Sequence, residues 1–160
     1  MANQEAQAKP KSNVGFWLGI LAIVLIMFFY SLTIPNSSQG LRDRVLKGNL
    51  HHIRNVIEQF KEDTGAYPSS LPDLIRARED APTAGVNAQG DAVPIAAGAY
   101  QGPYISFTGG IGNTGIPNNP YKKPDAADYH NIDAHWTYRN GILRPATEGE
   151  TLDGIPYTQL

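Results

Sequence analysis

Residues 14–34 read VGFWLGILAIVLIMFFYSLTI and contain no ionisable side chain. Shortly after them, residues 41–64 read LRDRVLKGNLHHIRNVIEQFKEDT, in which apolar and charged residues recur with a helical period. A helix that rises ~1.5 Å per residue needs about 20 apolar residues to cross the ~30 Å core of a bilayer. The sequence therefore predicts an N-terminal transmembrane helix over 14–34 that continues into an amphipathic helix.

A cleaved secretory signal peptide is the alternative to a retained anchor, because Lys9 and Lys11 precede the apolar run as a basic n-region would. The run is longer than a typical h-region, and the PNSSQG stretch after it is a poor cleavage site, so the sequence favours retention. Arg42, Arg44 and Lys47 follow the run, so the positive-inside rule does not fix the orientation.

The chain of 160 residues divides by composition into four predicted parts. Residues 1–13 are polar and predict a disordered leader, and residues 14–34 are the predicted transmembrane helix. Residues 35–40 contain a proline and a glycine and predict a helix break or linker. Residues 41–160 suffice for one globular domain, in which many glycines and prolines indicate loops and short strands.

Charge and cysteine content narrow the classes of partner. The formal net charge is −2 and no segment carries a block of like charges, which argues against binding nucleic acid. The chain has no cysteine, which excludes disulfides and thiol chemistry. The predicted partners are the lipid bilayer and other transmembrane helices, either copies of this chain or subunits of a larger membrane complex.

Residues 41–64 predict an amphipathic helix with one face suited to a core. Its apolar positions recur at spacings of four, three, four and three, which is the period of one helix face: Leu46, Leu50, Ile53, Ile57 and Phe60. Gly65 suits a left-handed C-cap and Pro68 prevents continuation, so the helix is expected to end near Thr64. We expect the stripe to pack on a small antiparallel sheet, which makes the fold class α+β.

Shorter elements are predicted after this helix. Ser70 followed by Pro72 indicates a short helix that runs to about Arg78, and residues 80–102 are expected to be irregular. The Asn140-Gly141 pair between β-prone runs is the strongest hairpin signal in the chain. The predicted strands are residues 103–107, 135–139, 142–144 and 155–158. Five aromatic residues are assigned to the core: Tyr67, Tyr104, Phe107, Trp136 and Tyr138.

Several stretches, in this order along the chain, resemble type IV pilins and the pseudopilins of type II secretion systems. Residues 50–68 (LHHIRNVIEQFKEDTGAYP) are similar to the second half of the long pseudopilin helix and the D-x-G-x-Y-P that ends it. Residues 69–75 (SSLPDLI) resemble the short helix that follows. Residues 102–105 (GPYI) and 116–121 (IPNNPY) resemble the G-P-Y-L and P-x-D-P-[WY] segments of the major pseudopilin, and residues 136–142 resemble its W-x-Y hairpin.

The resemblance implies a pilin-like fold and a structural function. A pilin-like chain would be a single-pass protein of a bacterial inner (cytoplasmic) membrane, with its N-terminus in the cytoplasm and its C-terminal domain periplasmic or extracellular. It would act by helix-mediated assembly into a filament or a secretion pseudopilus. The alternative is a non-polymerising accessory subunit of another membrane protein complex, with the same extracytoplasmic domain.

The family's processing motif supplies candidate site residues in the N-terminal helix. Prepilins typically carry G-F-T-L-x-E, which is cut after the glycine, and the Glu neutralises the N-terminal amine of a neighbouring subunit. Gly15 and Phe16 match the processing site, whereas Ile20 stands where the Glu is expected, which favours the accessory alternative. Gly15 and Gly19 also form a small-xxx-small face on which another helix can pack closely.

No enzyme motif occurs in the sequence, so we expect neither catalysis nor an organic cofactor. Asp125, Asp128 and Asp133 lie in a loop between predicted strands, where their carboxylates are candidate calcium ligands. Some major pseudopilins bind calcium near the C-terminus, but their ligand pattern is not reproduced here, so ordinary solvated turn residues are the favoured interpretation. Four histidines show no zinc-ligand spacing and are expected at surface or hairpin positions: His51, His52, His130 and His135.

Overall fold

The structure is a computed structural model that describes three stretches of the chain: residues 14–33, 35–106 and 109–160. The leader predicted over residues 1–13 lies outside the described residues. By their internal contacts the residues divide into two compact units, Met1–Ser38 and Gln39–Leu160.

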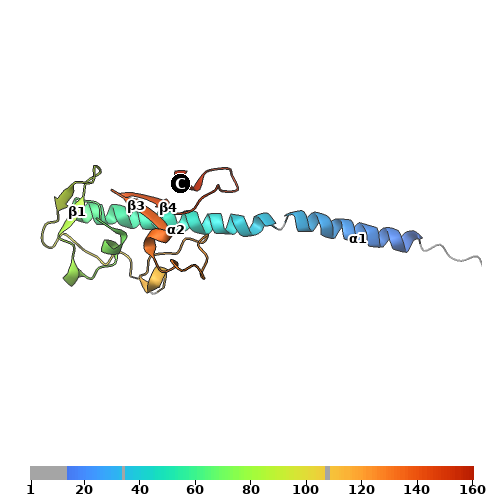
Figure 1. The fold of residues 1–160 in the computed structure, drawn as a ribbon, viewed down its shortest axis with the longest axis horizontal. Helices are drawn as coiled ribbons and strands as arrows, with labels where there is room; N and C mark the ends of the chain where they lie inside the picture. Colours follow the sequence, from blue (N-terminus) through green and yellow to red (C-terminus); the bar gives the residue numbers. More distant parts are fainter. Residues whose placement is uncertain (1–13, 34, 107–108) are drawn as a thin grey trace, which may run out of the picture. The chain divides into compact units, whose positions relative to one another are not determined.

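The N-terminal apolar run forms the helix α1 (Val14–Thr33) (Figure 1). Among the described residues, no helix combines the length and the apolarity that crossing a membrane requires. The predicted transmembrane helix over 14–34 is therefore wrong. The sequence also predicted a single-pass protein of a bacterial inner membrane, with a cytoplasmic N-terminus and a periplasmic or extracellular C-terminal domain. This predicted location is wrong for the same reason.

The amphipathic helix α2 (Pro35–Thr64) begins earlier than predicted. Residues 35–40, which predicted a helix break or linker, are helical and form its first turns. Proline is tolerated at the first helical position because an N–H there has no intrahelical partner. The end of the helix is confirmed, since Gly65 has φ +75° and its N–H donates to Lys61 O at 2.8 Å.

The core of the second unit is built on the predicted stripe of α2. Leu46, Leu50, Ile53, Ile57 and Phe60 are all buried, which confirms the helical period. The chain after α2 covers this stripe with buried side chains that come mostly from loops and short turns: Leu71, Leu74, Tyr100, Ile105, Ile111, Ile116, Trp136, Leu143 and Tyr157. Helix and loops therefore share one hydrophobic core.

The aromatic residues assigned to this core have different degrees of burial. Trp136 is fully buried, and its indole Nε1 donates to Pro117 O at 2.7 Å. Tyr67, Tyr104 and Tyr138 pack against the core while staying partly exposed. A buried aromatic ring with a polar group needs a hydrogen-bond partner, which Trp136 has. The prediction for Phe107 lies outside the described residues.

The short helix predicted from Ser70 is a single turn, η1 (Leu71–Leu74). Its start is as predicted, because Ser70 N donates to the Asp73 carboxylate at 2.9 Å. It ends earlier than predicted. The hydroxyl of Tyr100 donates to the carbonyl oxygens of Asp73 and Arg76 at 3.0 and 2.7 Å and occupies groups that a longer helix would use.

Two separate hairpins stand where one small sheet was predicted. β3 (Trp136–Arg139) pairs antiparallel with β4 (Ile142–Pro145), which confirms the hairpin signal. Asn140 and Gly141 connect the strands with positive φ angles of +51° and +84°, as a type I′ turn requires.

The second hairpin lies inside the stretch 80–102, which predicted irregular structure. β1 (Ala84–Val86) pairs antiparallel with β2 (Ala92–Pro94). Asn87 shapes the connection, because its side-chain oxygen accepts from the N–H groups two and four residues further on, at 2.9 and 2.8 Å. The turn is therefore held by a side chain rather than by a two-residue hairpin sequence.

Two predicted strands do not form. In segment 103–107, the N–H groups of the second and third residues both donate to Leu74 O, so the segment is tied to the end of η1 instead of to a strand. Segment 155–158 runs into the turn η5 (Tyr157–Gln159) and makes one isolated β-bridge to its own loop. Local hydrogen bonds thus replace the ladders that β-prone composition predicted.

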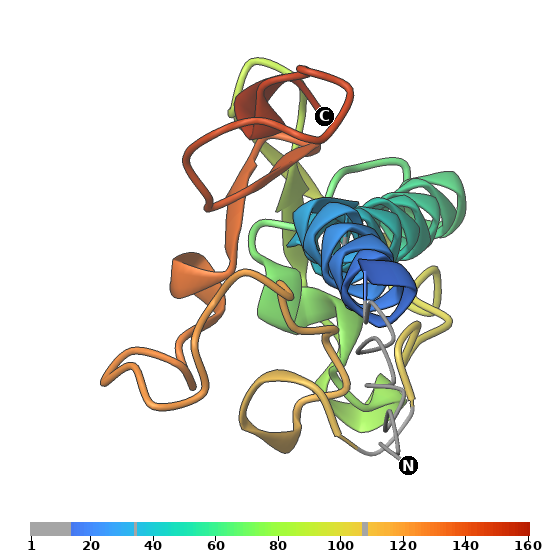
Figure 2. The same cartoon turned by 90° about the vertical axis from the view of Figure 1, so that its right-hand side faces the viewer.

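The elements of the second unit lie along α2. In Figure 1, β1 lies near the C-terminal end of the helix, and the β3–β4 hairpin lies along it. Figure 2 looks along the helix and shows that the chain after it curves around α2 instead of forming one flat layer. This arrangement places loops from distant parts of the sequence next to one another.

Replacing Ile53 by alanine in a chain limited to residues 39–160 should lower the free energy of unfolding by ~2–5 kcal/mol, because it leaves a cavity under the loops. Val45 lies on the same helix with 42% of its surface exposed, so Val45→Ala is the matched control and should cost less than ~0.5 kcal/mol. Urea unfolding followed by circular dichroism measures both. Equal losses, or no cooperative transition, would contradict this packing.

Candidate functional site

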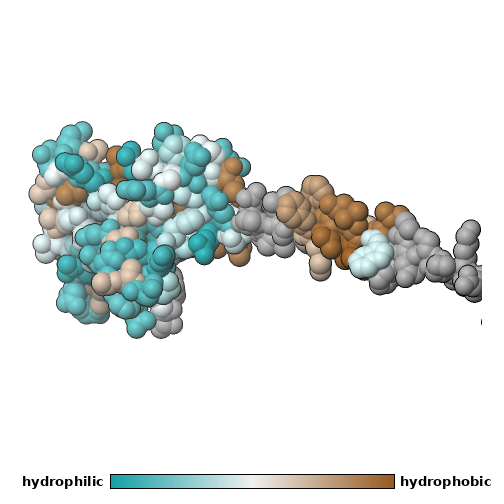
Figure 3. Space-filling model, turned by 45° about the vertical axis from the view of Figure 1, so that its right-hand side comes forward, coloured by the Kyte–Doolittle hydropathy of each residue, from teal (hydrophilic) through white to brown (hydrophobic). Residues whose placement is uncertain are grey.

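A large exposed apolar surface covers the described part of α1. All its large hydrophobic side chains are more than a third exposed, and Met27 reaches 69%. Figure 3 shows much of this surface in brown. Its members follow one another closely enough to point in all directions around the helix: Trp17, Leu18, Ile20, Leu21, Ile23, Val24, Leu25, Ile26, Met27, Phe28 and Phe29. Large contiguous apolar patches that are exposed on a protein surface mark interaction sites.

Gly19 lies within this surface. A Cβ placed on Gly19 would meet no atom within 4 Å, so nothing in the described chain requires a glycine there. Gly15 and Phe16, the predicted processing site, lie in the first turn of α1. The structure describes their backbone but not the surroundings of the Phe16 side chain. Residues four apart on a helix share a face, so Gly15 and Gly19 lie on one side of α1.

The three aspartates predicted as calcium candidates are not gathered into one site. Asp128 accepts from Lys122 Nζ at 2.6 Å, Asp125 is exposed, and Asp133 lies in the turn η4 (Ile132–Ala134). Within the part of the chain that the structure describes, no three histidine or acidic side chains are placed to hold a metal.

His135 lies in the interior, whereas a surface or hairpin position was expected. Its Nδ1 accepts from Asn119 N at 3.1 Å, and its Nε2 lies 2.6 Å from Tyr129 O. These partners assign the ring proton to Nε2, so the ring is neutral, and burial lowers the pKa of His135. Both nitrogens are occupied, so His135 is not free to act as a base or as a metal ligand.

Asn119 is the centre of the same buried cluster. Its Nδ2 donates to His135 O at 3.1 Å and to Thr147 Oγ1 at 2.6 Å, while its Oδ1 accepts from Tyr121 N at 3.0 Å. These bonds tie three separate segments together. The only sequence signal was the IPNNPY stretch of residues 116–121, which carried the resemblance but gave its polar residues no role.

A second buried polar cluster surrounds Asp43 near the start of the second unit. Its Oδ1 accepts from the hydroxyls of Tyr121 at 2.5 Å and Tyr157 at 2.8 Å, and its Oδ2 accepts from Leu152 N at 2.9 Å. Burial by itself would raise the pKa of Asp43, but these hydrogen bonds stabilise the carboxylate and hold the pKa below its usual value. The carboxylate thus fastens the C-terminal segment to α2.

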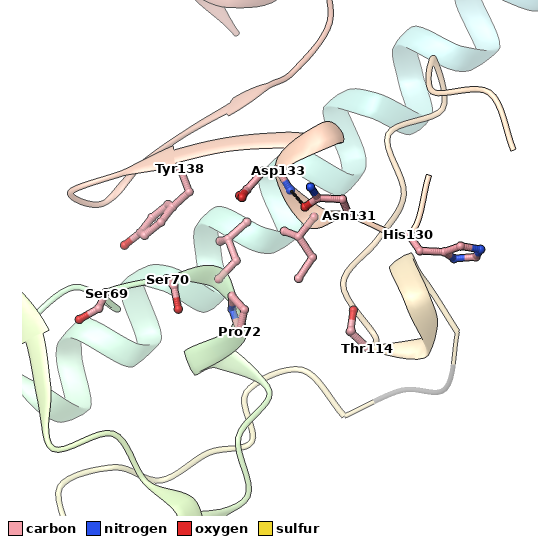
Figure 4. A pocket seen from close by; sticks show the side chains of 10 residues that line it. Ser69, Ser70, Pro72, Thr114, His130, Asn131, Asp133 and Tyr138 are labelled. Carbon is pink, nitrogen blue, oxygen red and sulfur yellow. Dashed lines mark hydrogen bonds between the residues drawn. The ribbon is translucent and has the colours of Figure 1, made fainter. Parts of the chain in front are cut away.

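A polar cleft of about 500 Å³ lies beside the β3–β4 hairpin. One wall is formed by residues 69–72, and another by residues 130–133 together with Tyr138 (Figure 4). Thr114 also lines the cleft, and its hydroxyl donates to Ile111 O at 2.7 Å. The cleft mixes hydroxyl, amide and carboxylate groups and the imidazole of His130 with a few apolar side chains.

Comparison of the chain with models of protein families, with curated proteins and with solved structures finds no match. The likeness to pilins and pseudopilins therefore rests on the sequence stretches alone.

Replacing Asp43 by alanine should lower the free energy of unfolding by at least ~2 kcal/mol, because it removes a carboxylate that accepts three hydrogen bonds. Amides of residues 150–157 should exchange with solvent faster. Asp153 forms an exposed ion pair with Lys47 at 3.4 Å, so Asp153→Ala is the control and should cost under ~1 kcal/mol. Unchanged exchange in Asp43→Ala would mean that other contacts hold the C-terminal segment.

His135 and Asp43 predict two separate pH windows. The folded pKa of His135 is lowered, so the unfolded chain binds the proton more readily and stability should fall as pH drops below about 6.5. The folded pKa of Asp43 is also lowered, so its stabilisation persists there and is lost only as pH falls below about 3.8. Urea unfolding at several pH values measures both. Constant stability between about pH 7 and 5 would contradict a neutral, buried His135.

Proposed function

We propose that this chain is a structural subunit that assembles with other protein chains through α1, as its resemblance to pilins and pseudopilins predicts. The exposed apolar surface of α1 supports this proposal most directly. A helix that is apolar on all sides is stable only when it is buried. Covering it contributes ~25 cal/mol per Å² of apolar surface removed from water, which gives assembly a strong driving force.

Gly19 indicates how closely a neighbouring helix approaches. Glycine in a helix costs ~1 kcal/mol relative to alanine, and no contact in the described chain offsets this cost at Gly19. A glycine on a helix surface lets another backbone come close. We therefore place a helix–helix contact at this side of α1, with other copies of the chain as the partner.

The second unit is the folded domain that each subunit contributes to the assembly. Figure 3 shows it with a mostly hydrophilic surface, in contrast to α1. The clusters at Asp43 and Asn119 hold its loops in place. The apolar helix is thus the part with a physical need for partners.

A second candidate function is that of an accessory subunit whose α1 packs against helices of a different protein. Ile20 favours it, because prepilins typically carry a Glu at the position that Ile20 occupies. Ile20 is 38% exposed and offers no charge to pair with a neighbour's amine. The two candidates differ in what covers the same surface.

Cysteine scanning distinguishes these candidates, because the chain contains no cysteine of its own. Single cysteines placed at each position from 17 to 29 are oxidised in cells that produce the full chain. Assembly with copies should give crosslinked dimers whose yield peaks every three to four positions. Crosslinks to a different protein would favour the accessory function. Equal yields at every position would contradict both candidates, and no dimer at any position would contradict assembly with copies of the chain.

Replacing Gly19 by leucine should reduce the peak dimer yield ~10-fold, equivalent to ~1.4 kcal/mol, because it blocks close approach while keeping α1 apolar and helical. Gly48 lies on α2, where an added Cβ also meets no atom within 4 Å, so Gly48→Leu is the matched control. Circular dichroism should show both variants folded. An undiminished yield in Gly19→Leu would show that this side of α1 is not the contact.

A further inference from the structure

We propose that the cleft beside β3 binds an extended peptide segment that carries a basic side chain and adds a strand to the free edge of β3. This inference is independent of how α1 assembles. It rests on the unpaired edge of the hairpin, on the shape of the cleft next to it and on the charge at its rim.

Among the described residues the β3–β4 sheet has two strands, so each strand has one edge without a described neighbouring strand. Arg139 and Ile142 close the two-residue turn and form a hydrogen-bonded pair, so the next pair, Tyr138 and Leu143, is a non-hydrogen-bonded one. Tyr138 therefore directs its backbone N–H and C=O away from β4. Among the described residues, neither group has a partner outside the hairpin.

The hydroxyl of Tyr138 is already hydrogen-bonded within the chain. The groups of Tyr138 that can bind an added strand are therefore its backbone N–H and C=O. Its hydroxyl donates to Pro68 O at 2.8 Å and accepts from Gly141 N at 3.2 Å. Tyr138 lines the cleft together with residues 69–72 and 130–133. The volume of about 500 Å³ falls within the ~300–1,000 Å³ of ligand pockets and suits a few residues of extended chain.

Asp133 gives the cleft a preference for cations, because the lining contains no other Asp or Glu and no Lys or Arg, and His130 is its only imidazole. Its side chain is exposed at the cleft, and none of the ion pairs within the described ranges involves it. Its backbone N–H donates to Asn131 Oδ1 at 3.0 Å, which fixes the η4 turn and so the place of the carboxylate. Figure 4 shows Asp133 and Tyr138 bordering the same space. A lysine or arginine of the bound strand would pair with Asp133.

An extended peptide is the occupant that satisfies both features together. An added strand supplies main-chain donors and acceptors to a free edge, and side chains at alternate positions supply specificity. A small polar ligand would satisfy the carboxylate but would leave the backbone N–H and C=O of Tyr138 without partners. A second copy of the chain meeting edge to edge is an outcome that the test below separates.

The test selects displayed random eight-residue peptides on the immobilised full chain. Selected peptides should contain lysine or arginine, and Asp133→Asn should weaken their binding about threefold to fivefold, as for an exposed ion pair. Asp125 is also exposed but lies outside the cleft lining, so Asp125→Asn is the matched control and should change nothing. N-methylation of alternate peptide residues should abolish binding, while methylation of the intervening residues should leave it intact, because only one set faces β3.

Four results would overturn the proposal. The first two are a selection that enriches no peptide and selected peptides that lack a basic residue. The third is an equal effect of Asp133→Asn and Asp125→Asn on peptide binding. The fourth is a loss of binding that does not alternate with the position of the N-methyl group along the peptide. Dimerisation of the isolated 39–160 unit that a selected peptide does not displace would assign the edge to a second copy instead. Asp133 makes no side-chain contact that folding needs, so the variant should unfold as wild type does.

Discussion

The packing of loops on the apolar stripe of α2 is the contact on which the rest of the second unit depends. The described part of the unit has two hairpins of two strands each, and an isolated hairpin is at best marginally stable in water. The helix supplies a long rigid surface from Leu46 to Phe60, and loops far apart in sequence are ordered because they cover it. Without this stripe, neither hairpin would have a core to join.

Loops that cover a core bring polar backbone groups inside, and these groups need partners. The two buried clusters meet this need and are joined to each other. Asn119 links His135 to Tyr121 through its side-chain amide, and the Tyr121 hydroxyl donates to Asp43. A continuous set of hydrogen bonds therefore runs from the start of β3 to α2, and Asp43 extends it to Leu152 near the C-terminus. Such a network specifies one arrangement of the loops.

Local sequence signals predicted local structure well. The stripe of α2 and the turn at Asn140-Gly141 depend on neighbouring residues, and both are confirmed. The β1–β2 hairpin was missed because Asn87 holds its turn through a side chain, without a two-residue turn sequence. The burial of Asp43 and His135 was missed because their partners are distant in sequence, as Leu152 is from Asp43. The transmembrane prediction failed although it rested on a local apolar run, and the role of α1 stays a proposal.

Residue-level hydrogen exchange of the 39–160 unit in increasing urea tests the central claim most directly, namely that the helix stripe and the loops covering it form one cooperative unit. Amides of α2 at Ile53 and Ile57 and amides in the covering chain at Ile116 and Trp136 should then exchange through the same opening, with equal free energies and equal dependence on urea. Retention of protection in α2 after the amides of Ile116 and Trp136 have lost theirs would contradict it, because the helix would then be stable without the loops.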